Sequence, residues 1–189
     1  MIKESTETRD NSEIIDIVDD NDVIIGLRKR DEVHRLGLLH REVHVWLFDK
    51  EKNIYFQKSP AHKSSAGLMD ASIGGHLNQG EEYLEAAVRE TKEESGLSIL
   101  ESDLILLTKF TGIKKHEKFG RINNFIRSVY VYKHPVSDGE LKADPLETDG
   151  FHKFSPDYLS NLSKEDELLF HKFIPTHELP FVLKYLQKI

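Results

Sequence analysis

The sequence predicts an α/β protein whose mixed central sheet is covered by helices on both faces. Residues 40–49, HREVHVWLFD, form the clearest strand, and both of its alternating sides are largely apolar, which is typical of a central strand. Residues 75–97 predict a loop, one amphipathic helix and a glycine stop. Predicted strands stand before, between and after the predicted helices, and this order indicates a sheet with helices packed on its two sides.

The composition is that of a globular protein without cysteine chemistry. The chain has 189 residues, and we expect a polar, flexible tail over residues 1–13 and a single domain over residues 14–189. The net charge is −7, which gives no basic footprint for a nucleic acid polymer. The absence of cysteine excludes disulfides and a cysteine nucleophile. With no long apolar run and no signal peptide at the N-terminus, we expect a cytoplasmic protein without a membrane span.

Short β-prone runs bounded by turn residues indicate further strands. They fall at residues 14–18, 23–26, 54–58, 69–75, 104–111, 122–132 and 151–154. The run 54–58 follows the strand 40–49 across a charged turn, so we expect these two strands to pair as a hairpin. The basic stretch 114–121, which contains a glycine, is expected to be another hairpin tip.

The remaining helical segments are indicated by local signals. The charged stretch 28–36 is compatible with a short helix or with an extended arm, and the sequence leaves both open. Ser155 followed by Pro156 predicts a helix start, with a capping hydroxyl and a proline in the first turn. The tail from Ser163 onward is expected to form two helices separated near Pro175, the second starting at Thr176.

The helix within residues 75–97 has clear ends and one apolar face. Gly80 interrupts any regular element before it, and Gly96 stands where a left-handed residue closes a helix. Glu81 and Glu82 are expected in the first turn, where the helix dipole favours negative charge. The residues of the buried face recur at i, i+3, i+4 and i+7, namely Leu84, Ala87, Val88 and Thr91.

Three carboxylates gather on a neighbouring face of the same helix. Glu90, Glu93 and Glu94 have the spacing i, i+3, i+4, so they point the same way. Like charges at these spacings repel by about 0.2–0.5 kcal/mol per pair, and we expect a bound cation to offset this repulsion. Mg²⁺ takes carboxylate oxygens together with phosphate oxygens and waters. The simpler alternative is a solvated acidic face neutralised by Arg89 and Lys92.

The spacing of residues 75–97 as a whole matches a longer motif than a charged helix would need. Residues 75–97, GHLNQGEEYLEAAVRETKEESGL, resemble the Nudix box, G-x5-E-x7-R-E-U-x-E-E-x-G-U, in which U is a bulky apolar residue. Every invariant position is matched, and the one departure is Thr91 at the first U position, where a methyl group is still present. The box covers 23 of the 189 residues. The resemblance implies a Nudix-type α/β/α sandwich with a mixed central sheet.

The resemblance also implies a reaction and a set of roles. The expected enzyme is a hydrolase of acid anhydrides that uses Mg²⁺, or alternatively Mn²⁺, to cleave a nucleoside diphosphate derivative or a related small diphosphate. Glu90, Glu93 and Glu94 are the expected metal ligands, and the carbonyl of Gly75 completes the metal sphere. Glu93 or Glu94 is the expected general base. Glu81 and Arg89 are expected to form an ion pair that orients the helix.

Further candidate residues outside the box are indicated by their residue type and position, without a motif. His76, Lys58 and Lys63 are the expected substrate contacts, on loops or strand ends near the box. His62, Lys114, Lys115 and Arg121 are further cations for a phosphate, although surface cations usually serve solubility. Glu147 stands in a loop where some Nudix proteins keep an extra base. Two loops, 59–70 and 134–150, are expected to choose the substrate, the first as a lid.

Two histidines on the predicted central strand allow two interpretations. His40 and His44 share one face of that strand, so they could belong to a metal site with His76. A zinc site needs three or four converging ligands, and packing or hydrogen bonding is the favoured role for His40 and His44.

Two other functions are compatible with the fold that the resemblance implies. The flanking sequence, LLHREVHVWLFD and GLMDASIGGHL, is similar to the isopentenyl diphosphate isomerases of the same superfamily. Those enzymes need a cysteine where this chain has Gly74 and a glutamate on a later strand, which here reads Ile122-Asn123-Asn124-Phe125. A non-catalytic nucleotide sensor is the other alternative, although such domains commonly lose box glutamates. A homodimer is compatible with the sequence.

Overall fold

The computed structural model describes residues 13–61, 65–116, 120–143 and 148–189. The expected flexible tail therefore lies, apart from Glu13, outside the described residues. Among the residues that are described, no helix is both long and apolar enough to cross a membrane.

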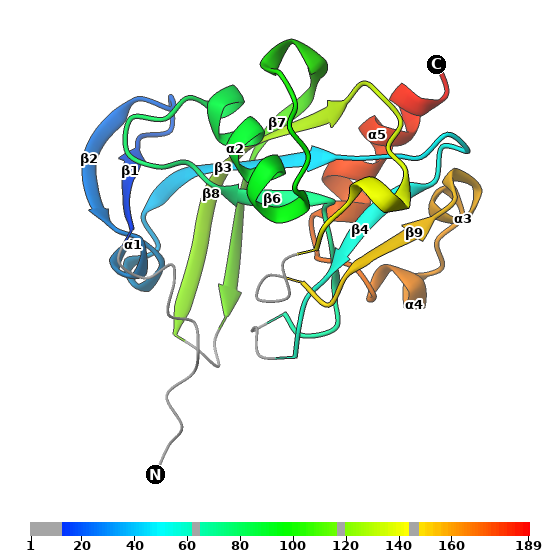
Figure 1. The fold of residues 1–189 in the computed structure, drawn as a ribbon. Coiled ribbons are helices and arrows are strands. Elements are labelled where there is room, and N and C mark those ends of the chain that lie inside the picture. Colours follow the sequence, from blue (N-terminus) through cyan, green and yellow to red (C-terminus); the bar gives the residue numbers. More distant parts are fainter. Residues whose placement is uncertain (1–12, 62–64, 117–119, 144–147) are drawn as a thin grey trace.

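A six-stranded mixed sheet forms the centre of the structure (Figure 1). Its strands are β1 (Ile14–Val18), β2 (Ile24–Lys29), β3 (Leu39–Trp46), β6 (Ile73–His76), β7 (Leu104–His116) and β8 (Arg121–Tyr132). The order across the sheet is β2-β1-β3-β8-β7, and β6 pairs with β3. β3 and β8 run parallel, whereas the other pairs are antiparallel. The prediction that residues 40–49 hold a central strand is confirmed.

A second, three-stranded sheet gives the predicted strand 54–58 two further partners. It consists of β5 (Met69–Asp70), β4 (Ile54–Lys58) and β9 (Phe151–Phe154), with β4 in the middle. The predicted hairpin turn is present: Phe48 and Ile54 form an antiparallel bridge, and backbone hydrogen bonds join Asp49 to Asn53 and Tyr55 to Leu47. The pairing with the segment after β3 is short, because β4 forms its ladders with β5 and β9.

The β7–β8 hairpin is longer than predicted. β7 continues to His116, so Lys114 and Lys115, expected at a hairpin tip, lie within the strand and pair with Asn123 and Ile122. Long antiparallel pairing satisfies the backbone groups of this basic stretch, which composition alone did not reveal.

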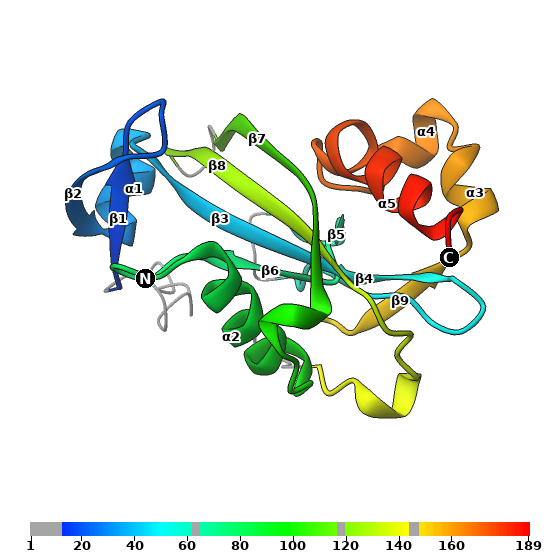
Figure 2. The ribbon, with the colours of Figure 1, turned by 90° about the horizontal axis from the view of Figure 1, so that it is seen from above.

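Five α-helices are found in the described part of the chain. They are α1 (Arg30–Leu36), α2 (Tyr83–Ser95), α3 (Pro156–Ser160), α4 (Lys164–Glu167) and α5 (Leu179–Leu186). α1 decides between the two alternatives for residues 28–36 in favour of a short helix. Figure 2 shows α2 on one side of the large sheet and α3 to α5 on the other, which is the predicted sandwich.

The caps of the C-terminal helices agree with the prediction in part. The hydroxyl of Ser155 accepts a hydrogen bond from the backbone N–H of Tyr158, and Ser163 caps α4 in the same way. Thr176, however, does not begin the last helix. It lies in a π-helical turn, Ile174–Glu178, that leads directly into α5, and its hydroxyl hydrogen-bonds to the carbonyl of Lys172.

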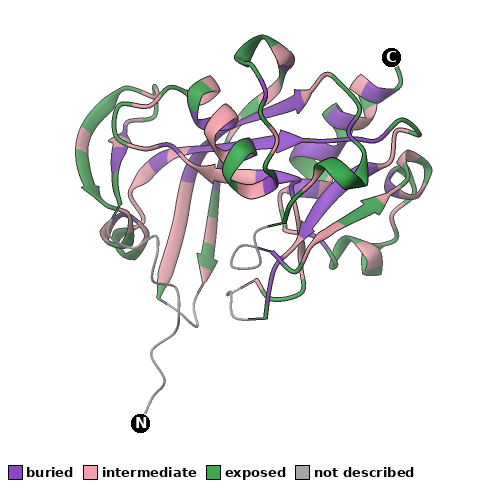
Figure 3. Cartoon of the chain, viewed as in Figure 1, coloured by how far each residue is buried: buried purple, intermediate pink, exposed green. Residues whose placement is uncertain are grey.

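Each face of the large sheet has its own apolar core, and Figure 3 shows β3 buried along most of its length. On the α2 side, Val43, Val45 and Leu47 pack with Ala86 and Ala87 of the helix. On the opposite side, residues of β3, β4 and β8 pack with α3 and α5, among them Trp46, Phe56, Val129, Leu159, Val182 and Leu186. The strict alternation along β3 therefore assigns each of its side chains to one layer.

A buried ionic network attaches the C-terminal segment to the sheet. The carboxylate of Glu178, which is fully buried, accepts hydrogen bonds from Nδ1 of His44 at 2.9 Å and Nε1 of Trp46 at 3.0 Å. Arg127 of β8 donates to Glu178 at 2.9 Å and to Glu42 at 2.7 Å. Burial alone would raise the pKa of Glu178, but His44 and Arg127 outweigh it and lower that pKa. His44 thus has the hydrogen-bonding role that was favoured for it.

Replacing Glu178 tests this attachment. Glu178→Gln is expected to lower the free energy of unfolding by about 3 kcal/mol, because the buried donors lose a charged acceptor. Urea denaturation followed by circular dichroism measures the change. Glu167→Gln, at an exposed position of α4, is the matched control and should change it by less than about 0.5 kcal/mol. Equal effects of the two substitutions would contradict the role given to the network.

Candidate active site

The loop before α2 is shaped by backbone hydrogen bonds to carboxylates. The N–H of Gly80 donates to Asp16 of β1 at 2.9 Å, and the N–H of Asn78 donates to Glu81 at 2.8 Å. Glu82 is the N-cap residue of α2 and forms a capping box with Glu85. Glu81 and Glu82 therefore precede the first turn in which they were expected. The turn begins one residue later because the capping box fixes the helix start.

Arg89 is the hub of the candidate site. Its Nε and Nη2 donate to the two carboxylate oxygens of Glu81 at 2.8 Å each, so the expected ion pair is present and bidentate. Nη1 donates to Glu90 at 2.8 Å and to Glu93 at 3.2 Å. Nη2 also donates to the carbonyl of His76 at 2.9 Å. Burial alone would lower the pKa of Arg89, but the glutamates, Glu81 first, raise it, so the guanidinium stays charged.

Glu90 occupies space that only a glycine at position 75 leaves open. A Cβ atom built on Gly75 would lie 2.0 Å from Oε1 of Glu90 and 2.1 Å from its carboxyl carbon. Gly75 lies on β6, so this contact joins the strand to the helix. Burial raises the pKa of Glu90 to about 7 even though Arg89 lowers it. The positive charge of Arg89 therefore does not fully offset the cost of burying the ionised Glu90 carboxylate, and a bound cation would stabilise the ionised form.

Glu94 and Glu93 differ in how firmly they are held. Glu94 accepts a hydrogen bond from Nε2 of Gln57 at 2.7 Å and one from the backbone N–H of Gly74 at 3.1 Å. The side chain of Glu93 is 59% exposed and contacts Arg89. The predicted helical spacing thus brings Glu90 and Glu94 against β6, with Glu93 beside them on Arg89. Oxygen donors of this kind are those that Mg²⁺ and Mn²⁺ take.

The structure places the predicted substrate contacts less favourably. In the β3–β6 pair, Gly75 is opposite Val43, whereas His76 is opposite Glu42, so the imidazole of His76 lies on the sheet face away from α2. Lys58 follows Gln57 on β4, so its side chain points to the opposite face from the amide that contacts Glu94. Lys63, His62 and Glu147 lie outside the described residues.

Two of the other predicted cations, Lys114 and Arg121, have partners away from the carboxylates of α2. Nζ of Lys114 hydrogen-bonds to Nδ1 of His171 at 2.7 Å, and Arg121 contacts Asp31 at 3.3 Å. The residue that the sequence did not indicate is Gln57, which fixes Glu94. No motif distinguishes this glutamine from any other on a strand, and only the placement of β4 beside α2 reveals it.

The fold and this carboxylate-bearing helix define a mixed-sheet sandwich with a loop–helix–loop at one sheet edge, the arrangement of Nudix domains. Residues 38–176 match the family model described as NUDIX domain, which is more than half of the chain. The chain belongs to the Nudix hydrolase family, and it is a Nudix-type hydrolase.

Individual relatives agree with this assignment. An uncharacterized Nudix hydrolase of Clostridium acetobutylicum is 30% identical over 88% of this chain and 82% of that protein. An isopentenyl-diphosphate Delta-isomerase of Serratia proteamaculans is 37% identical over 52% of this chain and 54% of the isomerase. The chain thus spans about half the length of some curated relatives that it matches. A crystal structure of a Deinococcus radiodurans protein aligns with a TM-score of 0.59 and 22% identity over 83% of this chain and 97% of that one, a likeness of fold.

A methyl group at position 75 tests the contact between β6 and Glu90. Gly75→Ala is expected to displace the Glu90 carboxylate and to weaken Mg²⁺ binding at least tenfold, because the new Cβ overlaps it. The same overlap should cost about 1–3 kcal/mol of folding free energy. Isothermal titration calorimetry with Mg²⁺ measures the affinity.

The matched control is Gly139→Ala. A Cβ at position 139 meets no heavy atom within 4 Å, so this variant should bind Mg²⁺ like the unchanged protein. If Gly75→Ala binds Mg²⁺ with unchanged affinity while folded, Glu90 at its present position is not a metal ligand.

Proposed function

We propose that this protein is a Mg²⁺-dependent hydrolase that cleaves a diphosphate bond in a nucleoside diphosphate derivative or a related small diphosphate. The observation that carries the proposal is the contact of Glu90 with Gly75, beside Glu93 and Glu94 and held by Arg89. Because Gly75 has no side chain, the Glu90 carboxylate can lie against the strand, where a Cβ atom would overlap it. Mn²⁺ takes the same oxygen donors and is the alternative ion.

The residues would divide the work as follows. Glu90, Glu93, Glu94 and the carbonyl of Gly75 would hold the ion. A bound divalent ion neutralises phosphate oxygens and lowers the pKa of bound water. The bidentate ion pair between Arg89 and Glu81 fixes the loop before α2 against the helix. Gln57 and the N–H of Gly74 orient the carboxylate of Glu94.

The general base is one of two glutamates. Gln57 and the backbone N–H of Gly74 donate to Glu94, whereas Glu93 is largely exposed and accepts a hydrogen bond from Arg89. Either carboxylate could accept the proton of an attacking water. Neutral amides at these positions keep the shape and remove the basicity, so single substitutions separate the two.

Glu93→Gln and Glu94→Gln test the proposed chemistry. Each is expected to lower kcat by about 10²–10⁴-fold if it removes the base, because general base catalysis typically contributes that factor. The assay uses a panel of nucleoside diphosphate conjugates, dinucleotides and prenyl diphosphates with Mg²⁺ or Mn²⁺, and the products are identified. Glu85→Gln, at an exposed position of α2, is the matched control. Cleavage at full rate by the double variant would contradict the mechanism.

A second candidate, isomerisation of an isoprenyl diphosphate, is supported by the similarity to isomerases but not by the space around Gly74. A Cβ at position 74 would lie 2.8 Å from Cδ2 of His44, a ring that Glu178 holds in place. The position at which the isomerases need a cysteine therefore has no room for one. On the later strand, Asn123 contacts Glu42 and Asn124 contacts the carbonyl of Gly37.

We expect purified protein not to interconvert the two isoprenyl diphosphates, with Mg²⁺, Mn²⁺ or Zn²⁺ present. Proton exchange followed by NMR in deuterated water measures the reaction. Deuterium incorporation at an enzyme-like rate would reverse the ranking of the two functions. The result would favour a non-catalytic nucleotide sensor if the protein cleaves no substrate of the panel while a nucleotide still raises its melting temperature.

A further inference from the structure

A cavity of about 280 Å³ lies where the small sheet meets the loop between β8 and β9. It is lined by Tyr55 of β4, by Phe151 and Lys153 of β9, and by Asp138, Leu141 and Ala143 of the loop. Several of these residues pack in the same apolar core as Ala86 and Ala87, so the cavity lies on the α2 side of the molecule. The loop residues belong to the segment 134–150, which was expected to choose the substrate.

The cavity begins one residue pair away from the candidate metal ligands. Tyr55 and Gln57 lie on the same face of β4, and the amide of Gln57 donates to Glu94 at 2.7 Å. The residue directly opposite Gln57 on β9 is Phe151, which lines the cavity. Two residues along a strand span about 7 Å. A pentose that joins a diphosphate to a base bridges a gap of this order, so one substrate can reach both places.

The walls of the cavity suit a flat ring. The rings of Tyr55 and Phe151 are perpendicular, with their centroids 6.4 Å apart, so they form a corner. A planar aromatic group can stack on one of these rings while its edge meets the other. Leu141 and Ala143 supply apolar contacts. The volume is just below the range of about 300–1,000 Å³ for sites of drug-sized ligands, so there is room for one ring system rather than for a long chain.

Polar groups of the same cavity can both accept and donate hydrogen bonds. The hydroxyl of Tyr55 donates to Oδ1 of Asp138 at 2.7 Å, and burial raises the pKa of Tyr55, so this hydroxyl stays protonated. Nζ of Lys153 contacts Asp138 at 2.9 Å and Asp49 at 3.2 Å. The side chain of Asp138 is 69% exposed and can only accept, whereas the ammonium of Lys153 can only donate. A ligand that carries N–H groups beside carbonyl or ring-nitrogen acceptors matches this pair.

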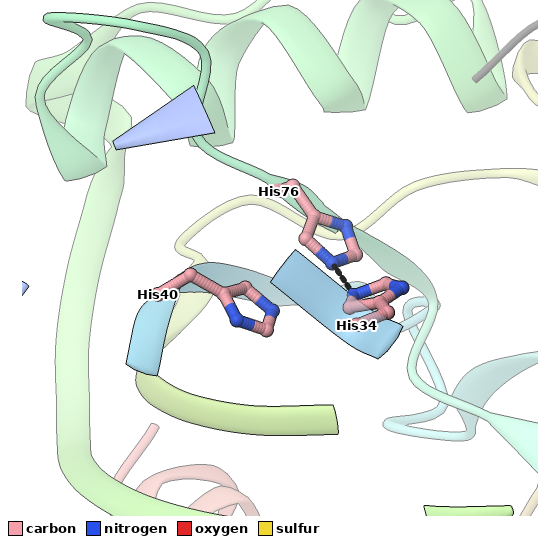
Figure 4. Close-up of side chains that lie close together, drawn as sticks. All are labelled: His34, His40 and His76. Atoms are coloured by element: carbon pink, nitrogen blue, oxygen red, sulfur yellow. Dashed lines mark hydrogen bonds between the residues drawn. The ribbon is translucent and has the colours of Figure 1, made fainter. Parts of the chain in front are cut away.

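Rings occupy the face of β6 that is turned away from α2. The ring of His76 stacks on that of His40 with centroids 5.0 Å apart, and its Nε2 lies 3.0 Å from Nε2 of His34 (Figure 4). The ring of His44 fills the space beside Gly74. Because these rings stand behind the strand, a group attached to a diphosphate at α2 finds its room on the α2 side, where the cavity lies.

We propose that this cavity binds the base of a nucleoside diphosphate derivative, a proposal that rests on the hydrolase function proposed above and selects one substrate class for it. A nucleobase is planar and presents N–H donors beside carbonyl or ring-nitrogen acceptors, which the walls and the polar groups of the cavity require. A prenyl chain has neither property. In the cavity it would cover Asp138 and Lys153 without offering them a hydrogen bond, which is costly.

The test measures binding and cleavage separately. Ala143→Phe fills the cavity from an exposed position, so it removes no buried contact. Isothermal titration calorimetry with Mg²⁺ compares the α,β-methylene analogues of ADP and CDP with methylenediphosphonate, which has no nucleoside. The substitution should weaken the binding of both nucleotide analogues at least about tenfold and leave that of methylenediphosphonate unchanged. For a cleaved nucleoside diphosphate conjugate, KM should rise by the same factor while kcat changes less than about twofold.

A second variant and a control of equal bulk accompany this substitution. Asp138→Ala keeps the cavity open but removes its acceptor, and it should weaken the nucleotide analogues about two- to tenfold, the effect of one lost hydrogen bond. Ser160→Phe, exposed at the end of α3 on the opposite side of the large sheet, should change none of these values. Circular dichroism verifies that all three variants are folded.

The proposal is overturned if folded Ala143→Phe binds the nucleotide analogues with unchanged affinity, or if the unchanged protein binds them no more tightly than methylenediphosphonate. Cleavage of a nucleoside diphosphate conjugate with a KM that Ala143→Phe does not alter would leave the hydrolase standing and overturn the role of the cavity. Nucleotide binding that Ala143→Phe abolishes, in a protein that cleaves no substrate of the panel, would support the cavity and contradict the hydrolase.

Discussion

The hydrogen bonds of one guanidinium hold the candidate site together. Arg89 contacts Glu81 of the preceding loop and Glu90 and Glu93 of α2, and these carboxylates would otherwise repel one another. Its further bond to the carbonyl of His76 attaches the helix to β6. The helix, the preceding loop and the strand are therefore positioned by the same group. Because the compensation of Glu90 is incomplete, the arrangement retains a demand for positive charge that a divalent ion can meet.

The alternation of β6 explains how one short strand takes part in two clusters. Gly75 faces α2 and admits the Glu90 carboxylate, whereas His76 faces the other layer and meets Glu42. The neighbouring Gly74 is opposite His44, whose ring fills the space that a larger residue would need. The ring of His44 thus leaves no room for a side chain at position 74. This packing favours hydrolysis over a reaction that needs a cysteine at position 74.

The local geometry of the acidic helix could be predicted from the sequence, whereas the long-range pairing of several strands could not. Fixed spacing on one helix indicated the carboxylates and the Glu81–Arg89 pair, because helical geometry converts spacing into direction. The short hairpin before β4 was predictable from its charged turn, but its ladders with β5 and β9 were not, because no local pattern encodes the pairing with β9, which is distant in sequence. The role of Gln57 and the meeting of His34 with His76 depend on the same long-range placement. His76 was expected near substrate, but the register of β6 turns its ring away.

The most direct measurement is hydrolysis of the best substrate of the panel in ¹⁸O-labelled water. With Mg²⁺ present, one phosphate-containing product should carry one ¹⁸O atom, and a chelator should stop the reaction. This result would show attack of water on phosphorus, the step that we propose for Glu90, Glu93 and Glu94. Cleavage that continues at full rate after the divalent ions are removed, or label found only on the carbon side of a broken carbon–oxygen bond, would contradict it.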